Sequence, residues 1–162
     1  MFSILFAHGF EGSPTGSKPT FLRKKTDFPV YSPILHKLGW TIRDMTNVIL
    51  STIDKNEDIN ILIGSSMGGL AASIASSERP KRKIKLILMA PAYGCITGFT
   101  NNLNQNEIKR WKETGFHEYE HKGIGELIKL PWSFVEEGYS LEWTMPCHPT
   151  IIIHGRKDDI VP

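Results

Sequence analysis

The sequence predicts an α/β fold in which a mostly parallel sheet carries helices on both faces. Short, continuous apolar runs recur along the chain, and each has the length and composition of a strand buried on both sides. Segments with helical spacing or high alanine content lie between these runs, and this alternation is typical of a parallel sheet. With 162 residues, 40% of them hydrophobic, the chain has the size of one domain, which we take as residues 1–162.

The first half of the chain begins directly with a core strand. Residues 3–8, SILFAH, form an apolar run that predicts a buried strand. Residues 11–20 are rich in Gly, Ser and Pro and predict a loop. The segment FPVYSPIL, which starts at Phe28, predicts a weaker strand because Pro33 interrupts it. Apolar side chains spaced by three and four positions then predict an amphipathic helix over residues 41–55.

The remaining strands repeat the buried pattern. Residues 59–64, INILIG, predict a second core strand. An alanine-rich segment follows at residues 70–78 and stops before Pro80, which suits a helix packed closely on a sheet. Two more apolar runs, IKLILMA at 84–90 and PTIIIHG at 149–155, predict further parallel strands.

Residues 92–147 have a different composition, with aromatic side chains among Glu, Lys, His and Gly and no long apolar strand. One interpretation is an ordinary connection between two strands that includes a crossover helix. The other, which we favour, is an insertion that folds over the carboxyl ends of the strands, where open parallel sheets bind ligands. Five aromatic residues of this insertion are candidate substrate-binding residues: Trp111, Phe116, Trp132, Phe134 and Trp143.

The motif G-x-S-x-G occurs at residues 64–68, between a predicted strand and a predicted helix. In this motif the chain makes a strained turn that exposes the central hydroxyl, here that of Ser66. Ser65 is not centred, because Ile63 and Met67 stand where its glycines would have to be. The helix that follows also directs its free N–H groups and positive dipole end towards the serine. We therefore predict that Ser66 is a catalytic nucleophile.

A serine that transfers acyl groups needs N–H donors for the oxyanion. One donor comes from the residue after the nucleophile and one from a loop that leaves a neighbouring strand. Met67 and Phe10, in the segment AHGFEGSP, are the candidates for this oxyanion hole. We interpret His8 as a residue that holds the loop by hydrogen bonding.

The segment IIIHGRKDDIVP places two carboxylates after the last predicted strand. Asp158 would lie at the carboxyl edge of the sheet, where it could orient a catalytic imidazole. The alternative is an ordinary turn aspartate. We expect Asp159 to point elsewhere.

These three segments, in this order, resemble the α/β-hydrolase superfamily. HGFEGSPTGSK followed by GSSMGG is similar to the small YqiA-type bacterial esterases, and WSFVEEG and HGRKDDIVP are similar to acyl-protein thioesterases. The resemblance implies the α/β-hydrolase fold, with Ser66 as nucleophile, Asp158 as acid of the catalytic triad, and Phe10 and Met67 as oxyanion donors. It also implies hydrolysis of a carboxylic ester or thioester through an acyl-enzyme, without a cofactor or a metal.

The family places its catalytic histidine after the acid, but only four residues follow Asp158. We interpret the 6 histidines of the chain as structural or facing solvent. Ending here would also leave the apolar run 149–155 as an exposed edge strand, which natural proteins avoid. We therefore expect a final strand and helix, with the triad histidine, beyond Pro162.

Composition excludes several other classes. The net charge of +2 lacks the basic stripe of a nucleic-acid-binding protein, and the KRK at residues 81–83 reads as a solvated loop. We expect no signal peptide, because the apolar start MFSILFAHGF is too short and lacks a basic flank, and no apolar run reaches the roughly 20 residues of a membrane span. Cys95 and Cys147 lack metal-type spacing and are expected to be free thiols in a reducing compartment. We expect a soluble cytoplasmic protein whose partner is a small-molecule ester or thioester.

Two other functions remain open. A non-catalytic hydrolase-like module that binds a ligand or a partner would explain the absence of a suitable histidine. A nucleotide-binding α/β domain is disfavoured, because GSSMGG does not fit G-x-G-x-x-G and no P-loop lysine follows it.

Overall fold

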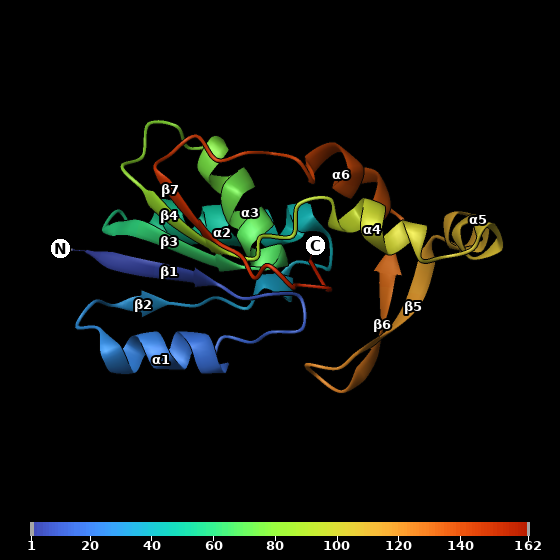
Figure 1. Ribbon diagram of the computed structural model, residues 1–162, viewed down its shortest axis with the longest axis horizontal. Helices are drawn as coiled ribbons and strands as arrows, with labels where there is room; N and C mark the ends of the chain where they lie inside the picture. The colour runs from blue at the N-terminus through green and yellow to red at the C-terminus, as the bar shows by residue number, and fades with distance from the viewer. Residues whose placement is uncertain (1, 162) are drawn as a thin grey trace.

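A five-stranded parallel sheet forms the centre of the molecule (Figure 1). The computed structural model describes residues 2–161. The strand order is β2-β1-β3-β4-β7, and every neighbouring pair is parallel. The strands are β1 (Ser3–Ala7), β2 (Val30–Tyr31), β3 (Ile59–Ser65), β4 (Lys85–Met89) and β7 (Thr150–Ile153). The predicted parallel sheet is therefore confirmed.

Helices pack on both faces of this sheet. On one face, α2 (Ile42–Lys55) and α3 (Met67–Ser77) share the larger core cluster with the inward side chains of the strands. On the other face, Leu22 of α1 (Ser17–Lys25) packs against a smaller cluster formed by β1 and β3. Successive strand residues alternate between the two clusters, as expected for a sheet covered on both sides.

Local sequence explains where the two long helices lie. Thr41 caps α2, because its hydroxyl accepts a hydrogen bond from the Asp44 N–H at 3.0 Å while the Asp44 carboxylate accepts from the Thr41 N–H at 3.1 Å. This capping box fixes the start of the predicted helix. The small side chains of α3 are buried almost throughout, which lets the helix lie close to the sheet.

Three of the predicted elements are corrected by the structure. The loop predicted over 11–20 ends early, because α1 begins at Ser17 and tolerates Pro19 in its first turn, where no N–H is needed. The strand predicted from Phe28 is reduced to the two residues of β2, and a short 3-10 helix, η1 (Leu35–Lys37), follows Pro33. Helix α3 starts at Met67, directly after the serine turn.

The segment between β4 and β7 contains helices and a hairpin. Its elements are α4 (Cys95–Asn101), α5 (Gln105–Thr114), β5 (Phe116–His121), β6 (Glu126–Pro131) and α6 (Ser133–Leu141). Strands β5 and β6 pair antiparallel. Figure 1 shows α4, α5 and the hairpin beyond the carboxyl ends of the parallel strands. The hairpin was not predicted, because charged residues alternate with its apolar ones and no continuous apolar run results.

Strand β7 lies at one edge of the sheet. Its isoleucines at positions 151, 152 and 153 are 62%, 48% and 57% exposed. Within residues 2–161, no strand pairs with its outer edge. The strand and helix expected beyond Pro162 stay a prediction.

A buried carboxylate joins the two ends of the segment between β4 and β7. Glu142 is 2% exposed and accepts hydrogen bonds from the N–H groups of Ile96 and Thr97, at 2.9 and 3.0 Å, and from the Thr97 hydroxyl. It thereby caps the first turn of α4 from the end of α6.

Replacing this carboxylate is expected to destabilise the protein. Glu142→Ala leaves the buried N–H of Ile96 unpaired and removes the partner of the Thr97 N–H, so we expect the free energy of unfolding to fall by about 1–3 kcal/mol. Glu142→Gln keeps an acceptor and should lose less. Urea denaturation measures both, with exposed Glu136→Ala in α6 as the control, expected to change stability by less than about 0.5 kcal/mol. Equal stability of Glu142→Ala and the control would contradict this role.

Candidate active site

Ser66 occupies a strained turn between β3 and α3. Its backbone angles are φ 53° and ψ −125°, and Ser66 and Ala90 are the non-glycine residues with positive φ in the described chain. A side chain in this region of φ costs about 1–3 kcal/mol and is characteristic of functional sites. The Ser66 N–H donates to the Met89 carbonyl at 3.0 Å, and the Ser66 carbonyl accepts from Ala92 N–H at 3.1 Å. These bonds hold the turn against the end of β4.

This turn needs glycine at positions 64 and 68, because backbone atoms of neighbouring segments lie where a side chain would have to be. A Cβ on Gly68 would lie 2.2 Å from the His8 carbonyl oxygen and 2.4 Å from that of Ala7. A Cβ on Gly64 would lie 2.5 Å from the Gly69 Cα. The glycines of the motif therefore bring the first turn of α3 against the ends of β1 and β3. The structure confirms the strand-turn-helix context predicted for the motif.

The Ser66 turn opens into a cavity with a volume of about 670 Å³. Its walls come from the loop after β1, the Ser66 turn, α4, the hairpin, α6 and the loop after β7. Its aromatic and aliphatic lining includes Phe10, Tyr93, Phe99, Tyr119, Leu130, Phe134, Ile160 and Val161. Within the described part of the chain, the Ser66 hydroxyl has no hydrogen-bond partner. An apolar substrate group bound in this cavity would therefore lie beside a hydroxyl that is not hydrogen-bonded to the described residues.

Phe10 and Met67, the predicted oxyanion donors, both line this cavity. Neither backbone N–H donates a hydrogen bond to any residue between positions 2 and 161. Met67 is the first residue of α3, so its N–H also lies at the positive end of the helix dipole. Two free N–H groups beside a free hydroxyl could bind a developing oxyanion.

His8 orients the peptide unit that carries the Phe10 N–H. Its Nδ1 lies 2.8 Å from the Gly9 carbonyl oxygen, and its Nε2 accepts from the Leu35 N–H at 3.4 Å. A carbonyl only accepts, so the proton resides on Nδ1 and the ring is neutral. Burial lowers the pKa of His8 and favours this neutral form. These contacts agree with the expected role of His8 in holding the loop.

The predicted acid, Asp158, is not among the residues that line the cavity, whereas the adjacent Asp159 is. Asp158 Oδ1 accepts hydrogen bonds from the N–H groups of Val161 and Ile160, at 2.9 and 3.1 Å, and these bonds lower the pKa of the carboxyl. Its Oδ2 lies 3.8 Å from His154 Nε2. Asp159, expected to point elsewhere, lines the cavity. Asp158 as a catalytic acid stays a prediction.

The described histidines are not themselves part of the cavity wall, although two of them contact the backbone of residues that line it. His121 and His154 have an Nε2 within 2.8 Å of the carbonyl oxygens of Phe10 and Val161. His148 contacts the Arg82 carbonyl at 2.7 Å, and His36 stacks on Trp40 with ring centroids 4.6 Å apart. Among residues 2–161, no histidine lines the Ser66 cavity.

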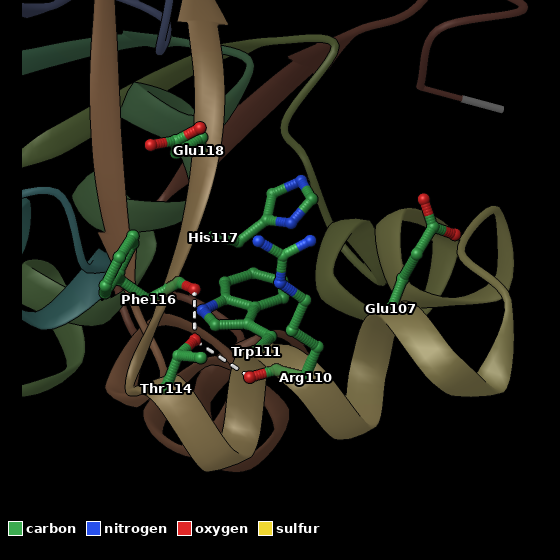
Figure 2. A pocket seen from close by; sticks show the side chains of 7 residues that line it. All are labelled: Glu107, Arg110, Trp111, Thr114, Phe116, His117 and Glu118. Carbon is green, nitrogen blue, oxygen red and sulfur yellow. Dashed lines mark hydrogen bonds between the residues drawn. The ribbon is translucent and has the colours of Figure 1, made fainter.

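The five aromatic residues proposed to bind substrate lie in different places. Phe134 lines the Ser66 cavity. Figure 2 shows Trp111 and Phe116 in a second, smaller cavity of about 240 Å³ beside α5, together with Arg110 and His117.

The two remaining tryptophans pack outside both cavities. Trp132 packs edge-on against Trp111, with ring centroids 5.8 Å apart. Trp143 is 66% exposed, and its ring covers Gly94, where a Cβ would lie 2.8 Å from it. Phe134 is therefore the one of the five that reaches the wall of the Ser66 cavity.

Sequence reasoning missed several residues that complete the wall. Tyr119 and Leu130 come from the hairpin, whose period-two alternation was a detectable signal. Phe99 and Cys95 come from α4. Burial, followed by the nearby Glu142 carboxylate, raises the pKa of the Cys95 thiol to about 12. This thiol is therefore not an activated nucleophile beside Ser66.

The parallel sheet and the serine turn at its carboxyl edge define an α/β hydrolase fold. The solved structure of mouse alpha/beta hydrolase domain-containing protein 10 superposes with a TM-score of 0.74 at 25% identity and covers 99% of this chain and 71% of that one. Est1E from Butyrivibrio proteoclasticus, solved with ferulic acid bound, has a TM-score of 0.73 at 18% identity, covering 100% of this chain and 72% of the enzyme. The second comparison bears on the fold alone.

The family follows from the sequence match. Residues 3–162 match the model of UPF0227, described as an uncharacterised protein family, and the chain belongs to this family. Bovine palmitoyl-protein thioesterase ABHD10, a mitochondrial protein, is 32% identical over 132 residues, which cover 70% of this chain and 39% of the bovine protein. The chain thus spans less than half the length of this curated relative. No helix in the described residues is long and apolar enough to cross a membrane.

Proposed function

We propose that this protein is a serine hydrolase that cleaves a carboxylic ester or thioester through an acyl-enzyme. The observation that carries the proposal is the strained Ser66 turn at the wall of an apolar cavity that Phe10 and Met67 also line. Within residues 2–161, the Ser66 hydroxyl and the backbone N–H groups of Phe10 and Met67 have no hydrogen-bond partner, so they are available to a substrate carbonyl. The likeness to a thioesterase and to solved hydrolases supports the reaction class.

The proposed reaction has two halves. Ser66 Oγ attacks the substrate carbonyl carbon while an imidazole base accepts the hydroxyl proton, and the carbonyl oxygen becomes an oxyanion bound by the two N–H groups. Collapse of this intermediate breaks the bond to the alcohol or thiol, which leaves with the proton. Water, which gives a proton to the imidazole, then attacks the acyl-enzyme carbonyl. The bond to Ser66 Oγ breaks, the carboxylic acid leaves, and the imidazole returns the proton to Ser66. Asp158 is the proposed residue that orients the imidazole.

The segment between β4 and β7 is the proposed cap of the acyl site. Its side chains Phe99, Tyr119, Leu130 and Phe134 supply apolar walls to the cavity that Ser66 enters. We include cytoplasmic location in the proposal, because Cys95 and Cys147 are both free thiols.

The second candidate function is a non-catalytic module that binds a ligand or a partner. It is favoured by the absence of a histidine from the cavity wall within residues 2–161. Assays of the 162-residue chain and of the whole reading frame that contains it, on p-nitrophenyl esters and on an acyl thioester, separate the two. Turnover by the whole protein and weak turnover by the shorter chain would support the hydrolase and a base beyond Pro162. Full folding with no turnover by either would favour the binding module.

Phe134 should affect which acyl chains are accepted. Phe134→Ala enlarges the cavity, so we expect the preferred acyl chain of p-nitrophenyl esters to become longer. We also expect kcat/KM for the shortest ester to fall by roughly 10-fold, which is the usual effect on kcat/KM of losing one apolar contact with the substrate. The matched control is Phe116→Ala, which removes the same side chain from the separate cavity beside α5. The same chain-length profile for both variants would contradict the assignment of this wall.

A further inference from the structure

The hairpin contacts the loop after β1 through the carboxylate of Glu11. This carboxylate accepts hydrogen bonds from the Tyr119 hydroxyl and from the Gly123 N–H, each at 2.7 Å. A Cβ on Gly123 would lie 2.2 Å from the Glu11 carbonyl oxygen, so the two backbones are in close contact. Residues more than a hundred positions apart in the chain are thus joined at the wall of the Ser66 cavity, which Glu11 and Tyr119 both line.

His121 joins the same two segments from the buried side. Its ring is 0% exposed, and its Nε2 donates to the Phe10 carbonyl oxygen at 2.8 Å. Its Nδ1 lies 3.1 Å from Glu11 Oε2 and 3.3 Å from the Ile124 nitrogen. A carbonyl only accepts, so the bond to Phe10 needs a proton on Nε2 whether the ring is neutral or charged. Both backbone flanks of Phe10 are therefore held, by His8 before it and by His121 after it.

The Phe10 ring is enclosed by the same elements. Its centroid lies 5.1 Å from that of His121 and 5.6 Å from that of Tyr119, both on β5. Trp40 and Phe134 complete the enclosure, at 5.5 and 6.2 Å. The position of the Phe10 backbone thus depends on whether the hairpin is docked.

We propose that Glu11 and His121 are positioning residues that couple docking of the β5–β6 hairpin to the oxyanion donor at Phe10. This inference rests on the proposed function, in which the Phe10 N–H binds the oxyanion. Neither side chain needs to touch the reacting atoms. Each fixes the peptide that does, so weakening the contact should reduce stabilisation of the transition state more than binding of the substrate.

The variants are Glu11→Ala, which removes the link, and Glu11→Gln, which keeps its shape and accepts hydrogen bonds without a charge. The matched control is Glu120→Ala, on the outward face of the same strand as Tyr119 and His121. Hydrogen exchange of the 162-residue chain should become at least about 10-fold faster in both 9–12 and 117–124 in Glu11→Ala. It should be unchanged in Glu120→Ala and intermediate in Glu11→Gln.

Kinetics of the whole protein supply the second readout. Glu11→Ala should lower kcat for p-nitrophenyl acetate by roughly 10- to 100-fold, while KM changes by less than about two-fold. The upper end of this range corresponds to the fall in kcat caused by removing one oxyanion donor. Glu11→Gln should recover part of kcat. Faster exchange confined to one of the two segments, or a rise in KM with kcat unchanged, would overturn the proposal. Failure of Ser66→Ala to reduce turnover would instead refute the proposed function. The hydrogen-exchange measurement would still test whether docking of the β5–β6 hairpin is coupled to the Phe10 segment.

Discussion

Ser66→Ala is expected to lower kcat/KM of the whole protein for short p-nitrophenyl esters by roughly four to six orders of magnitude. The variant keeps the oxyanion donors and the cavity but loses the atom that forms the acyl-enzyme, so only a small residual rate over water should remain. Steady-state kinetics measure the loss. Circular dichroism and the midpoint of thermal unfolding should match those of the unaltered protein, because the hydroxyl makes no hydrogen bond in the described chain.

The control for this variant is Ser77→Ala at the end of α3. Its hydroxyl only bonds back to the Ile74 carbonyl within the helix, at 2.8 Å, and lies outside the cavity. We expect kcat/KM within about two-fold of the unaltered protein. Retention of most activity by Ser66→Ala would show that another group attacks the substrate.

Gly68→Ala is expected to have the largest effect on stability. The added methyl group would meet the carbonyl oxygens of His8 and Ala7 at 2.2 and 2.4 Å, and both belong to rigid backbone at the end of β1. Overpacking typically costs about 1–3 kcal/mol and occasionally more. Because backbone at the end of β1 cannot move aside as a flexible side chain could, we expect the free energy of unfolding to fall by about 3 kcal/mol. Urea denaturation of the 162-residue chain measures it.

Gly98→Ala is the matched control in helix α4. Nothing lies within 4 Å of the Cβ it would add, and alanine is favoured over glycine in a helix by about 0.5–1 kcal/mol. This variant should therefore be as stable as the unaltered protein or slightly more so. Equal destabilisation by both substitutions would contradict the close approach of α3 to β1.

The parts of the fold that could be predicted are those encoded by local pattern. Buried strands of a parallel sheet are continuous apolar runs, and residues 59–64 and 84–90 are recognisable on that ground alone. The G-x-S-x-G spacing likewise predicts the Ser66 turn. Each of its two glycines lies so close to other backbone atoms that a side chain would not fit there. The hairpin was missed because only one of its faces is buried, so its strands carry charge at alternate positions.

The candidate site was harder to predict, because it depends on contacts between distant segments. Trp111 and Phe134 are both aromatic residues of the same segment, and the sequence does not distinguish their roles. Only the packing shows that Trp111, on α5, lines the separate cavity while Phe134 lines the Ser66 cavity. The contact of Glu11 with Tyr119 joins residues 108 positions apart, and nothing local to either residue indicates it. The orientation of Asp158 relative to Asp159 follows from a turn whose hydrogen bonds the sequence does not specify.

The central claim is that Ser66 is the nucleophile. Its most direct test is to treat the whole protein with a fluorophosphonate, which reacts with activated serines, and to locate the added mass by peptide mass spectrometry. The account predicts one label per chain, on Ser66, with loss of esterase activity in proportion to labelling and no label in Ser66→Ala. Labelling at Ser65 or elsewhere, or an unlabelled Ser66 in a protein that still turns over esters, would contradict it.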